Sequence, residues 1–385
     1  MERVSVILPV YNAEQYLPAA LASILLQDHD DIEIICINDG SSDRSADILR
    51  HAAAQDARII VIDRENRGLI RTLNEGIARA SGDLIARMDA DDIAYPSRIS
   101  TQVRAFRENG KLALSGCYFD TIYSPRRMLA AAMPEATQTL DLRIMSRFFT
   151  ILRHPTVMFR RSSMPEGMLQ YDEAYPCAED FDLFRRIADS CEVAQTTEPL
   201  LAYRLHDGSV SATRMATMVR THVAILEESL ARHYPEAAGT GFTAVAEDVN
   251  AATVAAASDL MRRLDRLAAA QPRNERRAFD IGIATTFYFL FSVIRETGSY
   301  ALACDFIEQA GRWDMIRRRE RPVLRMARQL PLAAGLGQRI LDANLKAKRR
   351  LGSRDVRKII PSYDAIDALA RRLVHLPLAK APADA

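Results

Sequence analysis

The first ninety residues alternate between two hydrophobic periods, and this alternation constrains the fold more than any other feature. Short apolar runs predict strands, and the segments between them repeat apolar residues every three or four positions, as on one helix face. The predicted strands are Val4–Leu8, Ile32–Ile37, Ile59–Ile62 and Leu84–Met88. The predicted helices are Ala13–Gln27, Asp43–Ala54 and Leu69–Ala80. Continuously apolar strands are buried on both faces, so we expect an α/β fold with a mostly parallel sheet and helices on both faces.

The pattern changes character along the chain. We expect a helix over Pro96–Gly110, a strand over Leu112–Phe119, a strand over His154–Phe159, a helix over Ala178–Asp189 and a strand over Leu200–His206. Residues 120–150 show no readable period. After about residue 212 the predicted strands stop, and only helices follow: Met215–His233, Ala244–Ala270, Arg276–Thr297, Arg312–Gln329, Ala333–Arg350 and Ser362–His375. A chain of 385 residues exceeds what one core usually supports. We therefore expect an α/β domain over 1–212 and an all-α C-terminal region over 213–385.

The two halves also differ in charge. Residues 1–210 carry a net charge of −8 and the remainder +9, although the whole chain is close to neutral at +1. The basic clusters Arg317–Arg321, Lys346–Arg350 and Arg354–Lys358 lie in the second half. Basic amphipathic helices can hold a protein on anionic lipid, and the same residues could form a homo-oligomer interface or simply a solvated surface. No recognition motif accompanies the charge, so we expect no nucleic-acid partner.

Cysteine usage and hydropathy bear on location. The five cysteines are scattered and form no CxxC pair, which indicates neither a disulfide framework nor a zinc site and fits a reducing, cytoplasmic setting. The short apolar run at the N-terminus contains Pro9 and resembles neither a signal peptide nor a membrane span. The later apolar segment Ile281–Ile294 is too short and too polar to predict a transmembrane helix.

Polar, turn-forming residues follow all four predicted strands of the first half. Each group is an ordinary turn sequence when taken alone. The groups are Pro9, Tyr11 and Asn12; Asn38, Asp39, Gly40 and Ser41; Glu65, Asn66, Arg67 and Gly68; and Met88 to Asp92. In parallel α/β sheets the carboxyl ends of the strands share one edge, and ligands bind there. Four such groups on one edge therefore predict a binding cleft.

The last of these groups contains three carboxylates, Asp89, Asp91 and Asp92, directly after an apolar strand. Like charges this close repel, and a divalent cation is the usual compensation because hard oxygen ligands suit magnesium and manganese. The alternative is an acidic loop that precedes the helix starting near Pro96, where carboxylates favour the helix N-terminus.

Five blocks in this order resemble the family 2 glycosyltransferases of the GT-A fold, a Rossmann-like fold. They are SVILPVYNAEQYL (5–17), INDGSSDRS (37–45), ENRGLIRTLNEGIARASGDLIARMDADD (65–92), AEDFDLFRRI (178–187) and the weaker YRLHDGSVS (203–211). The resemblance covers residues 3–212 and is nearest to bacterial enzymes of polysaccharide or glycoconjugate assembly. It implies transfer of a sugar from a nucleotide-sugar donor, UDP being favoured, to a hydroxyl of a glycan or lipid-linked acceptor, with Mn²⁺ or Mg²⁺ as cofactor.

The resemblance also implies roles for the catalytic and metal-binding residues. Asp91 would bind the metal, His206 would be a further ligand, and Asp89 would lie at the ribose or behind the metal. Asp180 would be the general base of a one-step attack that inverts the anomeric centre. Other interpretations stay open at this point: a lone histidine before a turn is often structural, and Asp180 could only stabilise the start of its helix.

The nucleotide pocket is assigned in the same way. Pro9 and Tyr11 would form its wall and stacking surface. Asp39 would accept a hydrogen bond from the base or the ribose. The third loop would contribute Asn66, Gly68 and Arg71. Tyr11 could instead belong to the core, and Asp39 could form an Asx-turn in the NDGS loop. His154 would shape the region of the donor diphosphate or of the acceptor.

One motif of related enzymes is missing. The chain has no QxxRW sequence, and its single tryptophan is Trp313. The processive membrane synthases related to this family carry that motif with several transmembrane helices, so an enzyme that adds one sugar fits better. Two alternatives differ in class. A nucleotidyltransferase would usually show a glycine-rich phosphate loop, which VILPVYNAEQ lacks, and a non-catalytic GT-A scaffold would be favoured by loss of the carboxylates, which are present.

Overall fold

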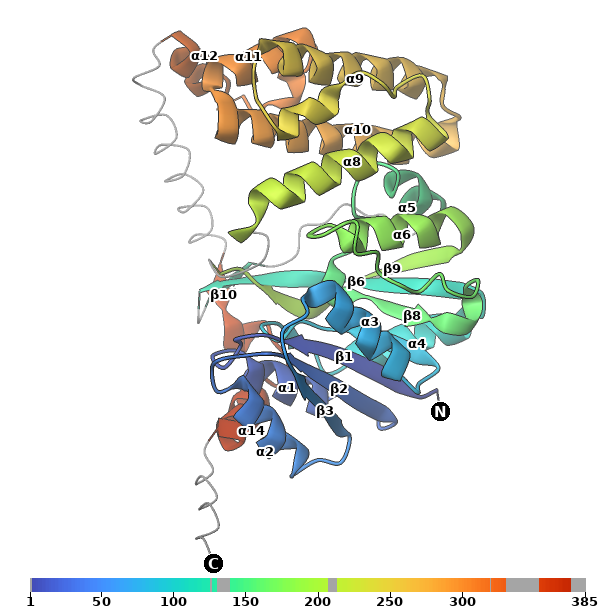
Figure 1. Ribbon diagram of the computed structural model, residues 1–385, viewed down its shortest axis with the longest axis vertical. Helices are drawn as coiled ribbons and strands as arrows, with labels where there is room; N and C mark the ends of the chain where they lie inside the picture. Colours follow the sequence, from blue (N-terminus) through green and yellow to red (C-terminus); the bar gives the residue numbers. More distant parts are fainter. Residues whose placement is uncertain are drawn as a thin grey trace, which may run out of the picture.

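The computed structural model describes residues 2–124, 127–129, 139–206, 213–318, 320–329 and 353–374. Short helices cover both sides of a twisted sheet, and a layer of helices from the second half of the chain packs on the outside of one side (Figure 1). Ten strands form one sheet, whose main path runs β10-β7-β6-β8-β4-β1-β2-β3, with β9 and β5 off this path.

The four strands expected in the first ninety residues are present and parallel. They are β1 (Val4–Val10), β2 (Ile32–Asp39), β3 (Ile59–Arg64) and β4 (Leu84–Arg87), with β1 pairing with both β2 and β4. Every residue of β1, β2 and β4 is buried, because helices cover both faces. On one face α1 (Leu17–Leu25) and α2 (Ser45–Ala53) contribute to one apolar core, and on the other α3 (Leu69–Arg79) contributes to a second. The α/β prediction is confirmed.

Beyond β4 the sheet is mixed. The long strands β6 (Leu112–Ser124) and β9 (Glu192–Arg204) run parallel to each other, whereas β8 (Met158–Arg160) is antiparallel to both β4 and β6. The short strand β5 (Ile93–Ala94) is antiparallel to β9, and β7 (Arg127–Leu129) is antiparallel to β6. The helices here are α4 (Arg98–Glu108), α5 (Thr139–Met145) and α6 (Glu179–Ser190).

One predicted strand is shorter than expected. The segment His154–Phe159 was expected to be extended throughout, but residues His154–Thr156 form a single 3₁₀ turn and β8 begins at Met158. Pro155 has no backbone N–H to donate to a neighbouring strand, which disfavours it within a sheet interior.

The second half is helical, as expected, with different boundaries. Its helices are α8 (Met215–His233), α9 (Ala251–Ala270), α10 (Arg273–Val293), α11 (Tyr300–Gln309), α12 (Arg321–Gln329) and α14 (Tyr363–Val374). The start expected at Ala244 is wrong, because Asn250 and Thr253 form a reciprocal capping box that begins α9 at Ala251. The expected helix from Arg312 begins only at Arg321, and α11 was not expected. The helix predicted over Ala333–Arg350 lies outside the described residues.

The apolar core is continuous between the two halves. Phe148, just after α5, stacks on Tyr234 with ring centroids 5.8 Å apart and meets Phe279 of α10 edge-on at 5.1 Å. The same cluster extends from Ile7 in β1 to Phe306 in α11. The domain boundary expected near residue 212 stays a prediction, but the apolar packing crosses it without a break.

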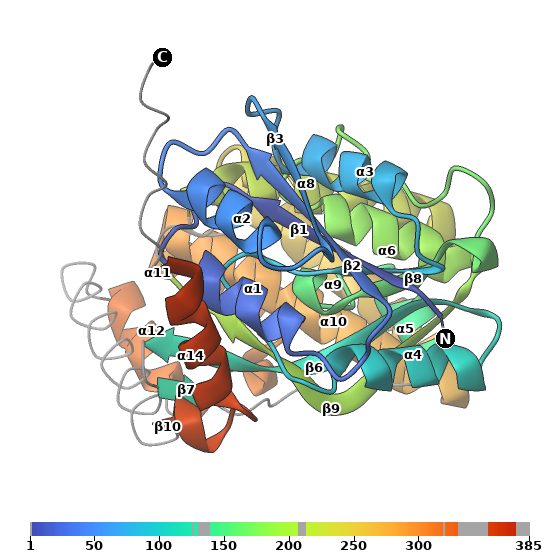
Figure 2. The same ribbon diagram turned by 90° about the horizontal axis from the view of Figure 1, so that it is seen from below.

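The last described segment returns to the α/β half. Strand β10 (Arg354–Asp355) pairs antiparallel with β7, and α14 packs against α1, as Figure 2 shows. Buried residues Ile366 and Leu373 of α14 belong to the same apolar cluster as β1 and α1. The expectation that strands stop near residue 212 is therefore wrong at β10.

Helix α10 and the π-helical turn after it form the most apolar long helix in the described part of the chain. The stretch Arg273–Glu296 is long and apolar enough to cross a membrane by length and composition, and it exceeds the segment Ile281–Ile294 noted in the sequence. More than half of its apolar window, 56%, is buried within the protein, where α10 packs on α5, α9 and α11.

We predict that Gly282→Ala destabilises the junction between the two halves. A Cβ at Gly282 would lie 2.4 Å from Cδ2 and 2.7 Å from Cγ of Phe148, whose ring is fixed in the aromatic cluster. We expect the free energy of unfolding to fall by about 1–3 kcal/mol, as for other overpacked cores, despite the better helix propensity of alanine. Urea unfolding measures it, with Gly110→Ala, where a Cβ meets nothing within 4 Å, as the control. Equal stability of the two variants would contradict the prediction.

Candidate functional site

The loop after β2 and the loop after β3 meet through one carboxylate. Asp39 is 5% exposed and accepts backbone N–H groups of Arg67 at 2.8 Å and Gly68 at 3.0 Å, and it also pairs with the Arg64 guanidinium. Gly68 has φ +85°, a conformation that favours glycine. Asp39 thus fixes the start of α3 from across the cleft edge, rather than forming only a local turn in the NDGS loop.

The loop after β1 joins the same edge. Pro9 is buried in β1 opposite Ile37, whereas Tyr11 is 57% exposed and does not belong to the core. Asn12 has a left-handed backbone at φ 47°, and its side-chain oxygen accepts from the Ser42 N–H at 2.8 Å. An exposed tyrosine ring beside two linked loops is consistent with the stacking surface expected of Tyr11.

Two further residues expected at the nucleotide lie on the third loop and on α3. Asn66 is exposed, and its backbone lies so close to Gly40 that a Cβ there would be 2.6 Å from the Asn66 nitrogen. Arg71 is exposed and forms an ion pair with Glu173 at 2.9 Å. The nucleotide contact expected of Arg71 stays a prediction, and it would require this guanidinium to share or exchange its partner.

The acidic residues after β4 gather as a cluster. Asp89, Asp91 and Asp92 each place one carboxylate oxygen within 4.8 Å of the others. His206, at the end of β9, contacts Asp91 through its Nε2 atom, 2.7 Å from Oδ2. The fold thus brings together the two residues expected to bind a metal, although 115 positions separate them in the sequence.

The rest of this cluster is held by arginines that the sequence analysis missed. Arg87, only 3% exposed, pairs with both oxygens of Asp89 at 2.5 and 2.7 Å. The Arg204 side chain donates to the Asp91 carbonyl at 2.7 Å, and its backbone N–H donates to Asp92 at 2.8 Å. Arg87 ends an apolar strand and directly precedes the MDADD run, so an arginine in that position beside three aspartates was the signal that could have revealed it.

The electrostatics of the cluster favour a bound cation. Burial, against the attraction of Arg87 and with repulsion by Asp91, raises the pKa of Asp89 to about 6. Burial and the two neighbouring carboxylates raise the pKa of Asp92 well above its ordinary value, and its Oδ2 atom is buried without a hydrogen-bond partner. Carboxylate oxygens and an imidazole nitrogen form a donor set that fits Mg²⁺ or Mn²⁺. The residues present therefore fit a divalent cation at Asp91 and His206, beside Asp89.

Asp180 lies in the first turn of α6 and is partly buried. One of its oxygens accepts the Phe181 N–H at 2.8 Å, and the other accepts the Thr150 hydroxyl at 3.3 Å. The negative charge of Asp180 also contributes to the raised pKa of Asp89, so the two carboxylates lie close enough to interact electrostatically. The structure thus places the expected base near the acidic cluster, although 88 residues or more separate them in the sequence.

A buried polar network lies beneath Asp180. His154 contacts the Tyr171 hydroxyl at 2.8 Å, and its Nδ1 atom is 3.8 Å from a carboxylate oxygen of Glu179. Burial, together with repulsion by Asp180, raises the pKa of Glu179 to about 7, and burial with the Arg87 charge lowers that of His154 well below its ordinary value. Nothing in the sequence around Tyr171 indicated this contact, because it depends on the fold alone.

The helical half supports the helix that carries Asp180. The Thr221 hydroxyl of α8 donates to the Pro176 carbonyl at 2.9 Å, and the His222 ring lies 5.5 Å from the ring of Phe181. Ala178, Phe181 and Ile225 form a small apolar cluster of their own. Residues after 212 therefore help to fix the start of α6.

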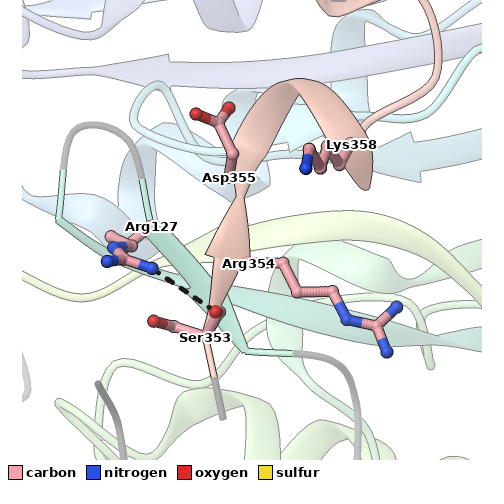
Figure 3. Close-up of a pocket in the computed structure, with 5 residues that line it drawn as sticks. All are labelled: Arg127, Ser353, Arg354, Asp355 and Lys358. Carbon is pink, nitrogen blue, oxygen red and sulfur yellow. Dashed lines mark hydrogen bonds between the residues drawn. The ribbon is translucent and has the colours of Figure 1, made fainter. Parts of the chain in front are cut away.

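A second, basic cavity lies where β10 joins β7 (Figure 3). It has a volume of about 520 Å³ and is lined by Arg127, Ser353, Arg354, Asp355 and Lys358. The Arg127 side chain donates to the Ser353 carbonyl at 3.5 Å, whereas Arg354 and Lys358 are exposed. Of the three basic clusters in the sequence, Arg354–Lys358 thus contributes to a concave surface, and Lys346–Arg350 lies outside the described residues.

Comparison with known proteins agrees with this geometry. The family model described as "Glycosyl transferase family 2" matches residues 5–166. A Haemophilus influenzae protein named "Uncharacterized glycosyltransferase" is 33% identical over 217 residues, 54% of this chain and 67% of its own length. The chain belongs to glycosyltransferase family 2. The Bacillus subtilis "Uncharacterized glycosyltransferase EpsJ" is also 33% identical, over 220 residues that cover 54% of this chain and 62% of EpsJ.

Solved structures agree on the fold. The crystal structure of S. aureus TarS 1–349 in complex with UDP-GlcNAc has a TM-score of 0.51 with this family 2 chain at 17% sequence identity. The match covers 76% of this chain and 90% of the TarS chain. At this sequence identity the structural likeness supports the GT-A fold and does not identify a substrate.

We predict that Glu179→Gln changes the pH dependence of stability. The pKa of Glu179 is about 7 in the folded protein and about 4.5 ordinarily, so between these values the folded state holds a proton that the unfolded chain has released. Stability from this group is therefore lost as pH rises from 4.5 to 7. Glutamine cannot ionise and does not lose this stability. The free energy of unfolding of the variant, relative to that of the wild type, should therefore rise by roughly 1–3 kcal/mol from pH 5 to pH 8.

Urea unfolding at the two pH values, in chelator, measures this difference. Glu166→Gln, which alters an exposed glutamate, is the control and should show no such pH-dependent gain. A stability difference between Glu179→Gln and the wild type that is the same at both pH values would contradict the prediction.

Proposed function

We propose that this family 2 glycosyltransferase transfers one sugar from a nucleoside-diphosphate sugar, with UDP as the nucleotide, to an acceptor hydroxyl, and that it inverts the anomeric centre. The single observation that carries this proposal is the contact of His206 with Asp91 beside the helix of Asp180. That contact would provide a cation site, with Asp180 as a separate carboxylate near it.

The donor would bind along the carboxyl edge of β1, β2 and β3. Asp39, Tyr11 and the loop that begins at Asn66 and ends at Gly68 surround this edge, and Asp39 and Gly68 are already linked by a hydrogen bond. A nucleoside base and its ribose need hydrogen-bond acceptors and an apolar face, which these side chains supply. Asp89 lies beside Asp91 in the acidic cluster, consistent with a role at the ribose or behind the metal.

Asp91 and His206 would hold the divalent cation, Mn²⁺ or Mg²⁺. When bound, such a cation supplies positive charge that stabilises the diphosphate leaving group. Arg87 keeps Asp89 ionisable next to this site, because their ion pair opposes the effect of burial on its pKa.

Asp180 would accept the proton of the acceptor hydroxyl. The hydroxyl oxygen then attacks the anomeric carbon while the bond to the diphosphate breaks on the opposite face. A single displacement of this kind inverts the configuration and needs one carboxylate base rather than a carboxylate nucleophile. A carboxylate accepts a proton in its ionised form.

The acceptor would be a glycan or a lipid-linked molecule of polysaccharide or glycoconjugate assembly, and the protein would work in the cytoplasm or at the inner face of the membrane. The basic cavity at β7 and β10 supports peripheral contact with an anionic surface, since Arg354 and Lys358 are exposed beside it. A homo-oligomer formed through the helical half is the alternative use of the same charge.

We predict that Asp180→Asn and Asp91→Asn separate catalysis from binding. Asparagine keeps the shape of residue 180 but cannot take the proton, so turnover should fall by roughly 10²–10⁴-fold with nucleotide affinity retained. Asp91→Asn should instead abolish the increase in UDP affinity that manganese gives the wild type. Release of the nucleoside diphosphate from a panel of UDP-, GDP- and dTDP-sugars measures turnover, and calorimetry with and without manganese measures binding.

Asp83→Asn is the control, because Asp83 is exposed and lies outside the cleft. Wild-type turnover in the Asp180→Asn variant would place the base elsewhere, with Glu179 and Asp182 as the next residues to test. Full activity in the presence of chelator would contradict the proposed requirement for a divalent cation.

We predict that Arg354→Glu with Lys358→Glu weakens binding to anionic vesicles. The double reversal changes the cavity charge by four units, so co-sedimentation with phosphatidylglycerol vesicles should fall, and wild-type binding should weaken in high salt. Arg104→Glu with Lys111→Glu is the charge-matched control, on exposed residues of and after α4. An equal loss in both double variants, or a wild type that ignores such vesicles, would contradict the prediction.

A further inference from the structure

Arg153 is an exposed arginine held on two aromatic rings. Its guanidinium carbon lies 5.0 Å from the ring centroid of Phe119 in β6 and 4.9 Å from that of Tyr203 in β9. The two rings meet edge-on with centroids 5.8 Å apart. Three separate parts of the chain thus fix one cation, and such stacking restricts the orientation of a planar guanidinium.

The charge of Arg153 has no counter-ion in the described part of the chain. Its guanidinium makes no hydrogen bond or ion pair there, although three carboxylates gather nearby. Those carboxylates already have other partners: Arg87 pairs with Asp89, and His206 contacts Asp91. Within the described residues, the five N–H donors of Arg153 therefore have no protein acceptor.

The position of Arg153 indicates which ligand group it would meet. Tyr203, its stacking partner, immediately precedes Arg204, which donates to the Asp91 carbonyl. Burial raises the pKa of Tyr203 to about 12, with Arg153 acting against this shift and the three clustered aspartates adding to it. Arg153 and the acidic cluster thus act on the same hydroxyl. Three residues earlier, Thr150 donates to Asp180.

We propose that Arg153 binds the diphosphate of the nucleotide sugar and stabilises the charge that develops on it as the sugar leaves. This inference rests on the proposed function. The acceptor oxygen forms its bond to the anomeric carbon and gives its proton to Asp180, while the bond from that carbon to the diphosphate oxygen breaks. The electron pair goes to the diphosphate, where a guanidinium can donate two parallel hydrogen bonds to phosphate oxygens.

The experiment compares Arg153→Ala with Arg104→Ala, a control at another exposed arginine, which lies on α4 and has no ion pair with the residues that the structure describes. Calorimetry in manganese measures the affinities for UDP and for uridine, which lacks the phosphates. We expect Arg153→Ala to weaken UDP binding by about 10–100-fold, as for a lost charged hydrogen bond, and to leave uridine binding unchanged. Turnover should fall as well, and added guanidinium chloride should restore part of it.

Two further variants test the structural details. Arg153→Lys keeps the charge without the planar fork and should bind UDP with intermediate affinity. Tyr203→Leu removes one stacking surface and should weaken UDP binding more than Tyr203→Phe, which keeps the ring. Thermal unfolding of each variant without nucleotide reports whether the fold is retained.

Several results would overturn the inference. Equal losses of UDP and uridine affinity in Arg153→Ala would assign the residue to structure alone, and unchanged UDP affinity would exclude contact with the diphosphate. A rise confined to the KM of the acceptor would place the guanidinium on the acceptor side. Failure of the wild type to bind any nucleotide or nucleotide sugar would instead contradict the proposed function, and the uridine measurement distinguishes the two cases.

Discussion

The concentration of negative charge after β4 is the constraint on which the rest of the site depends. Three carboxylates lie together at the end of a fully buried strand, and burial raises the pKa of two of them, Asp89 and Asp92. Arg87 opposes this for Asp89 by direct pairing, and Arg98, which is 1% exposed, donates to the Arg87 carbonyl at 2.7 Å and so fixes the strand end that carries it. Burying two arginines next to an acidic cluster costs desolvation free energy. Their positive charge is needed if the cluster is to stay ionisable and to bind a cation, as proposed.

The same cluster of carboxylates is contacted by residues at the carboxyl end of β9. Arg204 contacts Asp91 and Asp92 through its side chain and its backbone, and His206 completes the contact with Asp91. Register with β6 sets the position of both residues, since Ile122 lies opposite Arg204. Because Tyr203 belongs to the same strand, the register that places His206 also places one of the rings beneath Arg153. The β6–β9 pair thus positions both His206, a proposed metal ligand, and the rings that hold the exposed guanidinium.

The sequence allowed the parallel half of the sheet to be predicted because its strands are continuously apolar and its helices are short and periodic. The acidic residues at the strand ends followed from the same pattern. His206 and Asp180 were assigned only by resemblance, since no local pattern reports a contact over 115 residues. Arg153, Tyr171 and the return of α14 to α1 could not be predicted, because each depends on packing between segments that are far apart in sequence. Capping also decided details that hydrophobic periodicity could not, such as the start of α9 at Ala251, directly after its cap Asn250.

The contacts of the helical half give it a structural role that its charge pattern did not indicate. Its charge suggested a separate docking module, yet Thr221 and His222 contact the loop and helix that carry Asp180, and Tyr175 donates to Glu228 of α8 at 2.8 Å. A base must be held within a fraction of an ångström to be effective, and helix starts are held by whatever packs against their first turn. Helix α8 therefore helps to fix the position of Asp180, the proposed base. Surface charge can still serve docking at the basic cavity, because that cavity lies on the segment after the helical layer and leaves the contacts of α8 intact.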